Sequence, residues 1–283
     1  MRVLVTGSEG LVGSEVQAVL TANGHEVLGY DLRHGQDILD MATLTTASGG
    51  CDAVIHLAVS ENEVSESEEM HINLLGTWNV LLAAEAAHVS RVIYVSSVDA
   101  LGIFQGEGLP VYLPIDDAYP TIPHTAYAIA KRLAEEMCQF WSDRTGIPVL
   151  CLRPPGIWTA LTYLEIQQER AERPSYEWEP YWEYGAFIDV RDLATAVLHA
   201  LTCELAGYSL HLIASSDITT SGKTSRELVQ FVHPNVEWRS NQDYQAEPFR
   251  SLLVTQPVQQ LLGWRPEYTW QRFIEQTIPP SAT

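Results

Sequence analysis

Three glycines spaced three residues apart follow the first apolar run of the chain, and they constrain its fold more than any other feature. Gly7, Gly10 and Gly13 come directly after a strand-like segment and open a helix-like one. In such a unit the first glycine permits a tight turn, the second lets a pyrophosphate approach the backbone, and the third lets the helix pack on the strand. Leu11 and Val12 then offer free N–H groups at the positive end of the helix dipole. We therefore expect a dinucleotide site; the alternative is that the glycines only form a turn.

An aspartate at the end of the second strand-like segment indicates which dinucleotide this turn binds. Asp31 can accept hydrogen bonds from both ribose hydroxyls and repels a 2′-phosphate, so we expect NAD rather than NADP as the cofactor. Arg33, two residues later, could instead pair with a phosphate. Asp37 and Ile38 follow at a distance suited to contacting the adenine, with an ordinary loop position as the alternative for Asp37.

Apolar runs and amphipathic stretches alternate along the first half of the chain. We expect strands at Arg2–Thr6, Glu26–Tyr30, Asp52–Ala58, Arg91–Ser96 and Pro148–Arg153, and helices at Leu11–Asn23, Met70–His88 and Ala126–Arg144. The near-continuous apolar character of these strands is typical of parallel strands that are buried on both faces. The alternation predicts an α/β fold, a Rossmann-type doubly wound parallel sheet with a small C-terminal α/β cap lobe.

The character of the chain changes after Pro155. Residues 156–185 are rich in aromatic side chains and lack the periodicity of a strand, whereas Ala186–Val190, Arg191–Leu201 and Tyr208–Ile213 read as strand, helix and strand. We therefore expect an NAD-binding core at 1–155. Residues 156–283 are expected to form a mixed substrate-binding cap lobe that is interleaved with the last core elements.

Charge and cysteine content exclude several classes of partner. The chain has 283 residues and a net charge of −20, and such an acidic surface repels nucleic acids and anionic membranes. The acidic stretch Glu61–Glu69 reads as a solvated face. The four cysteines show no spacing of a disulfide framework or of a metal site, so we expect no metal and a reducing compartment. No apolar run reaches membrane length and the N-terminus leaves no room for a signal peptide, so we expect a cytoplasmic protein.

A tyrosine and a lysine one helical turn apart suggest catalysis. Tyr127 and Lys131 lie at i and i+4, on one helix face, in a chain that has only two lysines. A neighbouring cation would lower the pKa of the phenol towards a useful range. Ser97 and Pro154 each follow a predicted parallel strand, so we expect them at the same edge of the sheet as the glycine turn.

Taken together, the motifs resemble those of the extended short-chain dehydrogenase/reductases, the family of nucleotide-sugar epimerases and dehydratases, from Arg2 to about Trp270. The matching segments are Thr6–Gly13, His56–Ala58, Asn73–Thr77, Val95–Ser97, Tyr127–Lys131, Leu152–Pro154, Phe187–Asp192 and Leu262–Pro266. The resemblance implies that Tyr127 is the general acid/base, that Lys131 anchors the nicotinamide ribose, and that Ser97 bonds the reacting oxygen. It also implies that Leu57 and Ala58 line the path from pyrophosphate to ribose, with Asn73 in support.

Departures from the family pattern narrow the expected substrate. The acidic pair of the family's dehydratases reads Val98-Asp99 here, which argues against elimination. The residues with which nucleotide-sugar members hold a diphosphate are replaced at Gly156 and Gly185, and Arg250 is one of few cations left to replace them. We therefore expect a small sugar-like substrate, such as a free sugar or a sugar acid. Candidate substrate contacts are Ser60, Asp99, Trp158 and Tyr163; Asp99 could equally be a loop or cap residue, and the last two, with Trp178 and Trp182, could instead form the core of the cap.

The sequence thus predicts an NAD-dependent dehydrogenase or epimerase of a sugar, a sugar acid or a nucleotide sugar. The alternatives are a carbonyl reductase of a bulkier substrate, which Asp31 argues against, and a non-catalytic dinucleotide sensor, which would not need Tyr127 and Lys131. In the family, the helices that correspond to Met70–His88 and Ala126–Phe140 form a dimer interface, so the resemblance also implies a homodimer.

Overall fold

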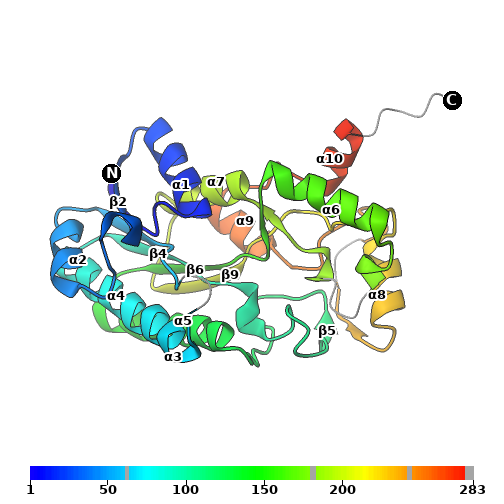
Figure 1. Ribbon diagram of the computed structural model, residues 1–283, viewed down its shortest axis with the longest axis horizontal. Helices are drawn as coiled ribbons and strands as arrows, with labels where there is room; N and C mark the ends of the chain where they lie inside the picture. Colours follow the sequence, from blue (N-terminus) through cyan, green and yellow to red (C-terminus); the bar gives the residue numbers. More distant parts are fainter. Residues whose placement is uncertain (61–63, 179–182, 241–243, 278–283) are drawn as a thin grey trace.

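A parallel sheet of six strands runs through the middle of the protein. The computed structural model describes residues 1–60, 64–178, 183–240 and 244–277. The strand order is β2-β1-β3-β4-β6-β9 (Figure 1). The strands are β1 (Arg2–Thr6), β2 (Glu26–Tyr30), β3 (Ala53–His56), β4 (Arg91–Val95), β6 (Val149–Arg153) and β9 (Tyr208–Leu212). The order changes direction between β1 and β3, where sheets of this kind bind their ligands, and the expected Rossmann-type α/β fold is confirmed.

Helices cover both faces of this sheet (Figure 1). One face carries α1 (Leu11–Ala22), α7 (Val190–Ala200) and α9 (Gln256–Leu262). The other carries α2 (Met41–Ser48), α4 (Thr77–Ala86) and α5 (Ala126–Thr145). Because both faces are covered, the four inner strands β1, β3, β4 and β6 are buried almost throughout their length, which explains their near-continuous apolar runs. The outer strands β2 and β9 are partly exposed.

The helix expected at Met70–His88 has a more complex structure. It begins earlier, with α3 (Glu66–Met70), whose first turn is capped by the Ser65 hydroxyl. A wider, π-helical turn follows at His71–Gly76 and leads into α4. Turns of this type are rare and are often found at functional sites, since they displace a side chain from the regular helical position. Here the turn contains Asn73, which the resemblance places near the cofactor.

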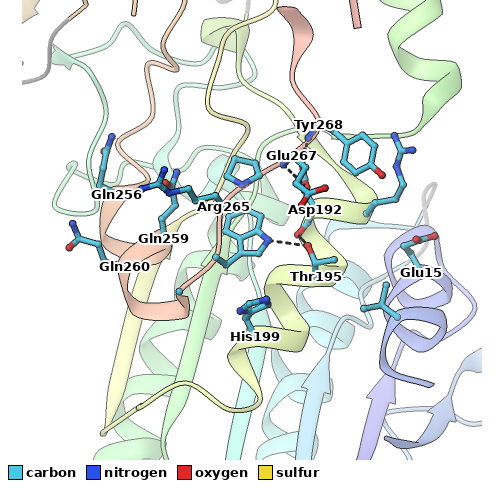
Figure 2. A pocket seen from close by; sticks show the side chains of 15 residues that line it. Glu15, Asp192, Thr195, His199, Gln256, Gln259, Gln260, Arg265, Glu267 and Tyr268 are labelled. Atoms are coloured by element: carbon cyan, nitrogen blue, oxygen red, sulfur yellow. Dashed lines mark hydrogen bonds between the residues drawn. The ribbon is translucent and has the colours of Figure 1, made fainter. Parts of the chain in front are cut away.

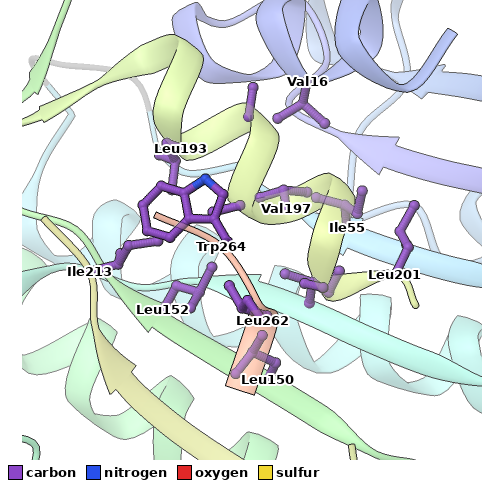
Figure 3. Close-up of a cluster of buried hydrophobic side chains, with 14 of the residues drawn as sticks. Val16, Ile55, Leu150, Leu152, Leu193, Val197, Leu201, Ile213, Leu262 and Trp264 are labelled. Atoms are coloured by element: carbon purple, nitrogen blue, oxygen red, sulfur yellow. The ribbon is translucent and has the colours of Figure 1, made fainter. Parts of the chain in front are cut away.

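The core on the α7 face is built around a tryptophan from the C-terminal part of the chain. Trp264 is 5% exposed and packs among apolar side chains of α7, β6 and the end of α9 (Figure 3). Its indole N–H donates to the Thr195 hydroxyl at 3.0 Å, so its one polar atom is satisfied. The Leu262–Pro266 motif thereby attaches the end of the chain to the nucleotide-binding half.

The C-terminal part of the chain contributes to both the sheet and a separate group of elements (Figure 1). Helix α7 and strand β9 belong to the core, as expected, but the predicted strand at Ala186–Val190 is shorter and lies outside the main sheet. The elements beside the core are α6 (Ala160–Glu172), α8 (Ser225–Val232), α10 (Trp270–Thr277) and two small sheets, β5 (Tyr112–Leu113) with β10 (Glu237–Trp238) and β7 (Ile157–Trp158) with β8 (Ile188–Asp189). Helices α2 and α6 were not predicted from the sequence. The division of the chain at residue 155 stays a prediction. Among the described residues, no helix is both long and apolar enough to span a bilayer.

The outer strand β9 has a polar neighbour at its free edge. The Asp117 carboxylate accepts the backbone N–H of Leu212 at 2.7 Å and bonds Nδ1 of His211 at 2.6 Å. Nε2 of the same imidazole bonds the Ser209 hydroxyl at 2.7 Å. This chain of hydrogen bonds occupies backbone and side-chain groups that an exposed sheet edge would otherwise offer to another strand.

A buried ion pair fixes α5 on the sheet. Glu135 and Arg153 are 0% and 2% exposed, and the guanidinium bonds both carboxylate oxygens at 2.8 and 2.7 Å. The Ser96 hydroxyl donates to the same carboxylate at 2.6 Å. Since every charge here is paired and hydrogen-bonded, the arrangement tolerates burial, but neither partner can be removed alone without leaving an unpaired charge.

We expect Glu135→Ala to lower the free energy of unfolding by about 3 to 5 kcal/mol, because it leaves the Arg153 guanidinium buried without its partner. Urea unfolding followed by far-UV circular dichroism measures this. Glu136→Ala is the matched control: Glu136 is adjacent, partly exposed and paired with Arg132 on the surface, so its loss should change stability by less than about 1 kcal/mol. Equal effects of the two variants would contradict this account of the buried pair.

Candidate active site

Four parallel strands end at one edge of the sheet, and the predicted site residues follow them. Gly7 comes directly after β1, Leu57 after β3, Ser97 shortly after β4 and Pro154 after β6. Two cavities open at these positions, one of about 630 Å³ that includes the glycine turn and one of about 260 Å³ that includes Ser97 and Tyr127. We call them the dinucleotide pocket and the crevice.

The glycine turn is as tight as its sequence predicts. Gly7 has φ +69°, and a Cβ atom there would lie 2.7 Å from the backbone nitrogen of Ala58. A Cβ atom on Gly13 would lie 2.1 Å from the carbonyl oxygen of Gly7. Neither position can accept a side chain without a backbone shift. The absence of side chains at Gly7 and Gly13 therefore lets the start of α1 lie in backbone contact with the end of β1.

A histidine that the sequence analysis assigned no role holds the end of β3 against β1. His56 is 1% exposed; its Nδ1 lies 2.7 Å from the Thr6 hydroxyl and its Nε2 lies 2.9 Å from the Thr77 hydroxyl. Thr77 donates its own proton to the carbonyl of Asn73 at 2.6 Å, so the imidazole must donate from Nε2 and accept at Nδ1. Burial lowers the pKa of His56 to about 3, and the Lys131 charge adds to the decrease, so the ring is neutral.

The carboxylate of Asp31 is positioned by the turn it faces. It accepts the backbone N–H groups of Glu9 and Arg33, each at 2.9 Å. The Arg33 guanidinium donates to the carbonyl of Glu9 at 2.7 Å, which ties this cation to the glycine turn. The ribose-binding acid predicted from the sequence therefore lies in the wall of the dinucleotide pocket.

The remaining predicted cofactor residues divide between this pocket and the surrounding structure. The dinucleotide pocket is lined by Gly7, Gly10, Asp31, Asp37, Ile38, Leu57, Ala58 and Ser60, among others. Leu11 is exposed at the start of α1, beside a second small cavity, and Val12 packs against the core. Asn73 is buried; its amide accepts the N–H of Ser60 at 3.0 Å and donates to the hydroxyl of that residue at 3.2 Å. Asn73 therefore contacts the pocket wall at Ser60 without lining the pocket itself.

The crevice brings together the predicted catalytic residues. Ser97, Asp99, Tyr127 and Pro154 all line it, although they come from three separate segments of the chain. The Ser97 hydroxyl caps the short helical turn Val98–Leu101 by accepting the N–H of Asp99 at 3.1 Å. This bond fixes the Ser97 hydroxyl oxygen at the N-terminus of the turn, where it lines the crevice.

Lys131 lies behind Tyr127, in a nearly water-free position. Its side chain is 4% exposed, its Nζ donates to the carbonyl of Val95 at 3.0 Å, and it lies 5.7 Å from the centre of the Tyr127 ring. Burial lowers the pKa of Lys131 to about 8. Burial also raises the pKa of Tyr127 to about 12; the Asp99 charge adds to this increase and hydrogen bonding with Ser97 opposes it. In the protein alone, desolvation therefore outweighs the lowering that we expected from the neighbouring lysine.

The structure places three of the proposed substrate contacts away from the crevice. Trp158 and Tyr163 are buried in an aromatic cluster, where Trp158 stacks on Phe187 at 4.6 Å and meets Tyr163 edge-on at 5.2 Å. They form part of the core of the C-terminal region because packing against each other removes more apolar area from water than lining an open crevice would. Ser60 lines the dinucleotide pocket and not the crevice. The side chains of Trp178 and Trp182 lie outside the described residues.

A larger cavity does not contain any of the predicted site residues. It has a volume of about 900 Å³ and lies among α1, α7 and the segment that follows α9, with Glu15, Thr195, His199 and Arg265 among its lining (Figure 2). The Asp192 carboxylate beside it accepts the N–H groups of Glu267 and Tyr268 at 2.9 Å each, so it fastens the loop that closes this cavity. The predicted site residues therefore lie at the smaller cavities and not at this larger one. Among the described residues, no three His, Cys, Asp or Glu side chains cluster as a metal site would require.

Comparison with known proteins assigns the family. Residues 3–209 match the model of the NAD-dependent epimerase/dehydratase family. The chain belongs to this family. The match confirms the extended short-chain dehydrogenase/reductase resemblance and NAD as the cofactor of the family to which the chain belongs.

Individual relatives of this epimerase/dehydratase family member differ in activity. The chain is 29% identical to the GDP-6-deoxy-D-mannose reductase of Pseudomonas aeruginosa, over 95% of this chain and 93% of that protein. It is 30% identical to the L-arabinose 1-dehydrogenase (NAD(P)(+)) of Haloferax volcanii, over 62% of this chain and 73% of that protein. In fold it is similar to a short-chain dehydrogenase/reductase superfamily protein from Agrobacterium tumefaciens solved with bound NAD, with a TM-score of 0.71, 22% identity and coverage of 98% and 95% of the two chains.

We expect Asp31→Asn to weaken NAD binding and to raise the affinity for NADP relative to NAD by about tenfold, because it removes the charge that repels a 2′-phosphate. Titration calorimetry with both dinucleotides measures the ratio. Asp143→Asn, at an exposed position far along α5, makes the same change of net charge and should leave the ratio unchanged. An unaltered ratio in Asp31→Asn would remove this carboxylate from the ribose site.

Proposed function

We propose that the protein oxidises a hydroxyl group of a small sugar-like substrate with NAD, as a dehydrogenase or as the first half-reaction of an epimerase. The observation that carries the proposal is the crevice, where Ser97 and Tyr127 face one cavity with Lys131 directly behind the phenol. The proposal extends to the residues that would hold the cofactor: the glycine turn at the pyrophosphate, Asp31 at the ribose and Asp37 with Ile38 at the adenine. The close backbone approach at Gly7 fits a dinucleotide, since a side chain there would meet the backbone at Ala58.

The chain's own residues supply the proton chemistry. NAD, when bound, supplies the acceptor for a hydride from the carbon that bears the hydroxyl group. Tyr127 takes the proton of that hydroxyl as the carbonyl forms, and Ser97 donates a hydrogen bond to the same oxygen. Lys131 stays a nearby cation and favours the phenolate, because a positive charge stabilises the ionised form of a neighbouring acid. For epimerisation, Tyr127 would return the proton as the hydride returns to the opposite face.

The relatives support a sugar as the substrate class, since their names include both a free sugar and nucleotide sugars. One relative is named for a free aldose, L-arabinose, and others for nucleotide sugars, among them the UDP-glucose 4-epimerase of Halalkalibacterium halodurans. We therefore propose a sugar, a sugar acid or a nucleotide sugar as the substrate class. A carbonyl reductase of a bulkier substrate is less well supported, since we would expect it to use NADP and Asp31 in the wall of the dinucleotide pocket favours NAD. Purified protein that retains NAD and yields no net NADH with its substrate would indicate epimerisation; net NADH would indicate a dehydrogenase.

We expect Tyr127→Phe to lower kcat by about 10²- to 10⁴-fold, the range for loss of a general acid/base, while the Kd for NAD changes little. NADH formation at 340 nm across a panel of sugars, sugar acids and nucleotide sugars, with calorimetry for the Kd, measures both. Tyr268→Phe removes a phenol outside the crevice and should keep full turnover. Full turnover by Tyr127→Phe would show that the proton goes elsewhere.

We also propose that the protein forms a homodimer through α4 and α5. Leu133 and Phe140 of α5 are apolar side chains with 38% and 68% of their surface exposed, which an interface between helices would cover. Sedimentation equilibrium should then give twice the mass of the chain, and Phe140→Glu should shift the equilibrium towards monomer. A monomeric wild-type protein at micromolar concentration would contradict this.

A further inference from the structure

The crevice beside Tyr127 contains two carboxylates and no cation. Asp99 and Glu183 line it together with Ser97, Gln105 and apolar residues. Among the described residues of this lining there is no arginine, lysine or histidine. The residues outside the described ranges cannot add one, because none of residues 61–63, 179–182, 241–243 and 278–283 is cationic. Lys131 is not part of this lining: its ammonium is bonded to the carbonyl of Val95 behind Tyr127, and from there its charge lowers the pKa of Asp99.

Asp99 is held in place from two sides. Gln105 donates to its carboxylate at 2.9 Å from the loop opposite, and the N–H of Asp99 is bonded to the Ser97 hydroxyl. Its carboxyl group therefore lies beside both Ser97 and Tyr127, and its charge acts on the phenol. The pKa of Asp99 is raised by burial, and hydrogen bonds from Gln105 and Ser97 oppose the increase.

Glu183 is presented to the crevice by an unusual backbone. Glu183 and Tyr184 have φ of 53° and 55°, a left-handed conformation that residues with side chains rarely adopt. The Tyr184 ring anchors this segment, because it is fully buried and packs edge-on against Phe104 at 5.1 Å. Such conformations persist only where the surrounding packing fixes them, and they are common at ligand sites.

Glu183 is exposed, and its carboxylate lines the crevice next to Gly156. A Cβ atom on Gly156 would lie 3.8 Å from its Oε2, an ordinary van der Waals distance, so this oxygen lies beside the chain that follows β6. Desolvation and the nearby Asp99 charge raise the pKa of Glu183, which shows that the two carboxylates share one electrostatic environment. A ligand between them meets hydrogen-bond acceptors on two sides.

We propose that the crevice selects an uncharged, hydroxyl-rich substrate, a free aldose or a similar polyol, whose hydroxyl groups donate to Asp99 and Glu183. Hydrogen bonds from hydroxyls to ionised carboxylates are short and strong. The same two charges repel a carboxylate or a diphosphate, which no cation of the lining would neutralise. The volume of about 260 Å³ is below the range typical of drug-sized ligands, in agreement with a single sugar ring. This inference rests on the proposed function and narrows its substrate class to uncharged sugars.

The test compares each neutral sugar with its own acid. NAD reduction is measured with galactose and galacturonate, glucose and glucuronate, the cationic amino sugar glucosamine, and UDP-glucose. In parallel, calorimetry on protein saturated with NADH measures the affinity of the same ligands without turnover. We expect the wild type to prefer the better aldose over its uronate by at least about tenfold in kcat/KM and in affinity. The reason is that the uronate anion is repelled by the partly solvated carboxylates of Asp99 and Glu183.

A variant that removes one charge but keeps the shape of the crevice shows whether charge or shape excludes the uronate. Glu183→Gln keeps the size and one acceptor, so we expect it to narrow the aldose-to-uronate ratio by about tenfold and to reduce the effect of added salt on that ratio. Glu165→Gln, on the exposed surface of α6, makes the same change in net charge and should leave the ratio unaltered.

The outcomes distinguish this inference from the function on which it rests. A wild type that prefers the uronate, UDP-glucose or a cationic amino sugar, or an unaltered ratio in Glu183→Gln, overturns the inference. If Tyr127→Phe is inactive on that charged substrate, the redox function stands. If no sugar reduces NAD but the neutral ligands bind with the expected preference and Glu183→Gln narrows it, the crevice is assigned correctly and the proposed oxidation is wrong.

Discussion

The turn between β1 and α1 closes only because two positions have no side chain, and the nucleotide-binding half is arranged around this contact. The backbone at Gly13 lies against the carbonyl of Gly7, which in turn lies against the chain at Ala58. Three segments therefore meet through backbone atoms alone. The buried hydrogen bonds of His56 with Thr6 and Thr77 hold the next layer, so the end of β3 and the start of α4 are fixed relative to β1. The proposed anion site at this turn is therefore formed by the close approach of backbone segments and not by a set of charged side chains.

Desolvation determines the charge states around α5. The pKa values of His56, Lys131 and Tyr127 are all shifted towards the neutral form, to about 3, about 8 and about 12. In the same region Glu135 and Arg153 offset the cost of their burial by pairing with each other through two hydrogen bonds. A cation brought next to Tyr127 would lower the pKa of the phenol, against the increase caused by burial and by the charges of Asp99 and Glu69. The phenol is thus sensitive to whatever occupies the adjoining pocket.

The fold could be predicted from the sequence where local pattern and burial agree. All five expected strands of the first half exist, since strands covered on both faces leave unbroken apolar runs. The aromatic residues after Pro155 did not reveal their role, because a buried cluster and a sugar-stacking surface have the same composition. Helix α6 was missed for a different reason, since its apolar residues show only a weak helical periodicity.

The candidate site was predictable in its motifs and not in its long-range contacts. Ser97, Tyr127 and Lys131 could be placed because each follows a strand or a helical spacing. His56 was not, since a histidine at the end of an apolar strand gives no sign of the two threonines that bond it. Glu183 was missed as well: it lies more than fifty residues from Tyr127, and its backbone conformation has no signature in residues other than glycine.

The ion pair on α5 has a further consequence: the position of the Tyr127 phenol and the lining of the crevice can change independently of each other. Glu135 lies one turn beyond Lys131 and two beyond Tyr127, so the attachment of this helix to β6 sets the position of the phenol along the sheet. Three residues that define the shape and charge of the crevice, Asp99, Gln105 and Glu183, do not bond to Glu135 or Arg153. Under the proposed function, substitutions at these three positions would change the preferred ligand while the position of Tyr127 stays the same, which makes them the natural positions for redesign.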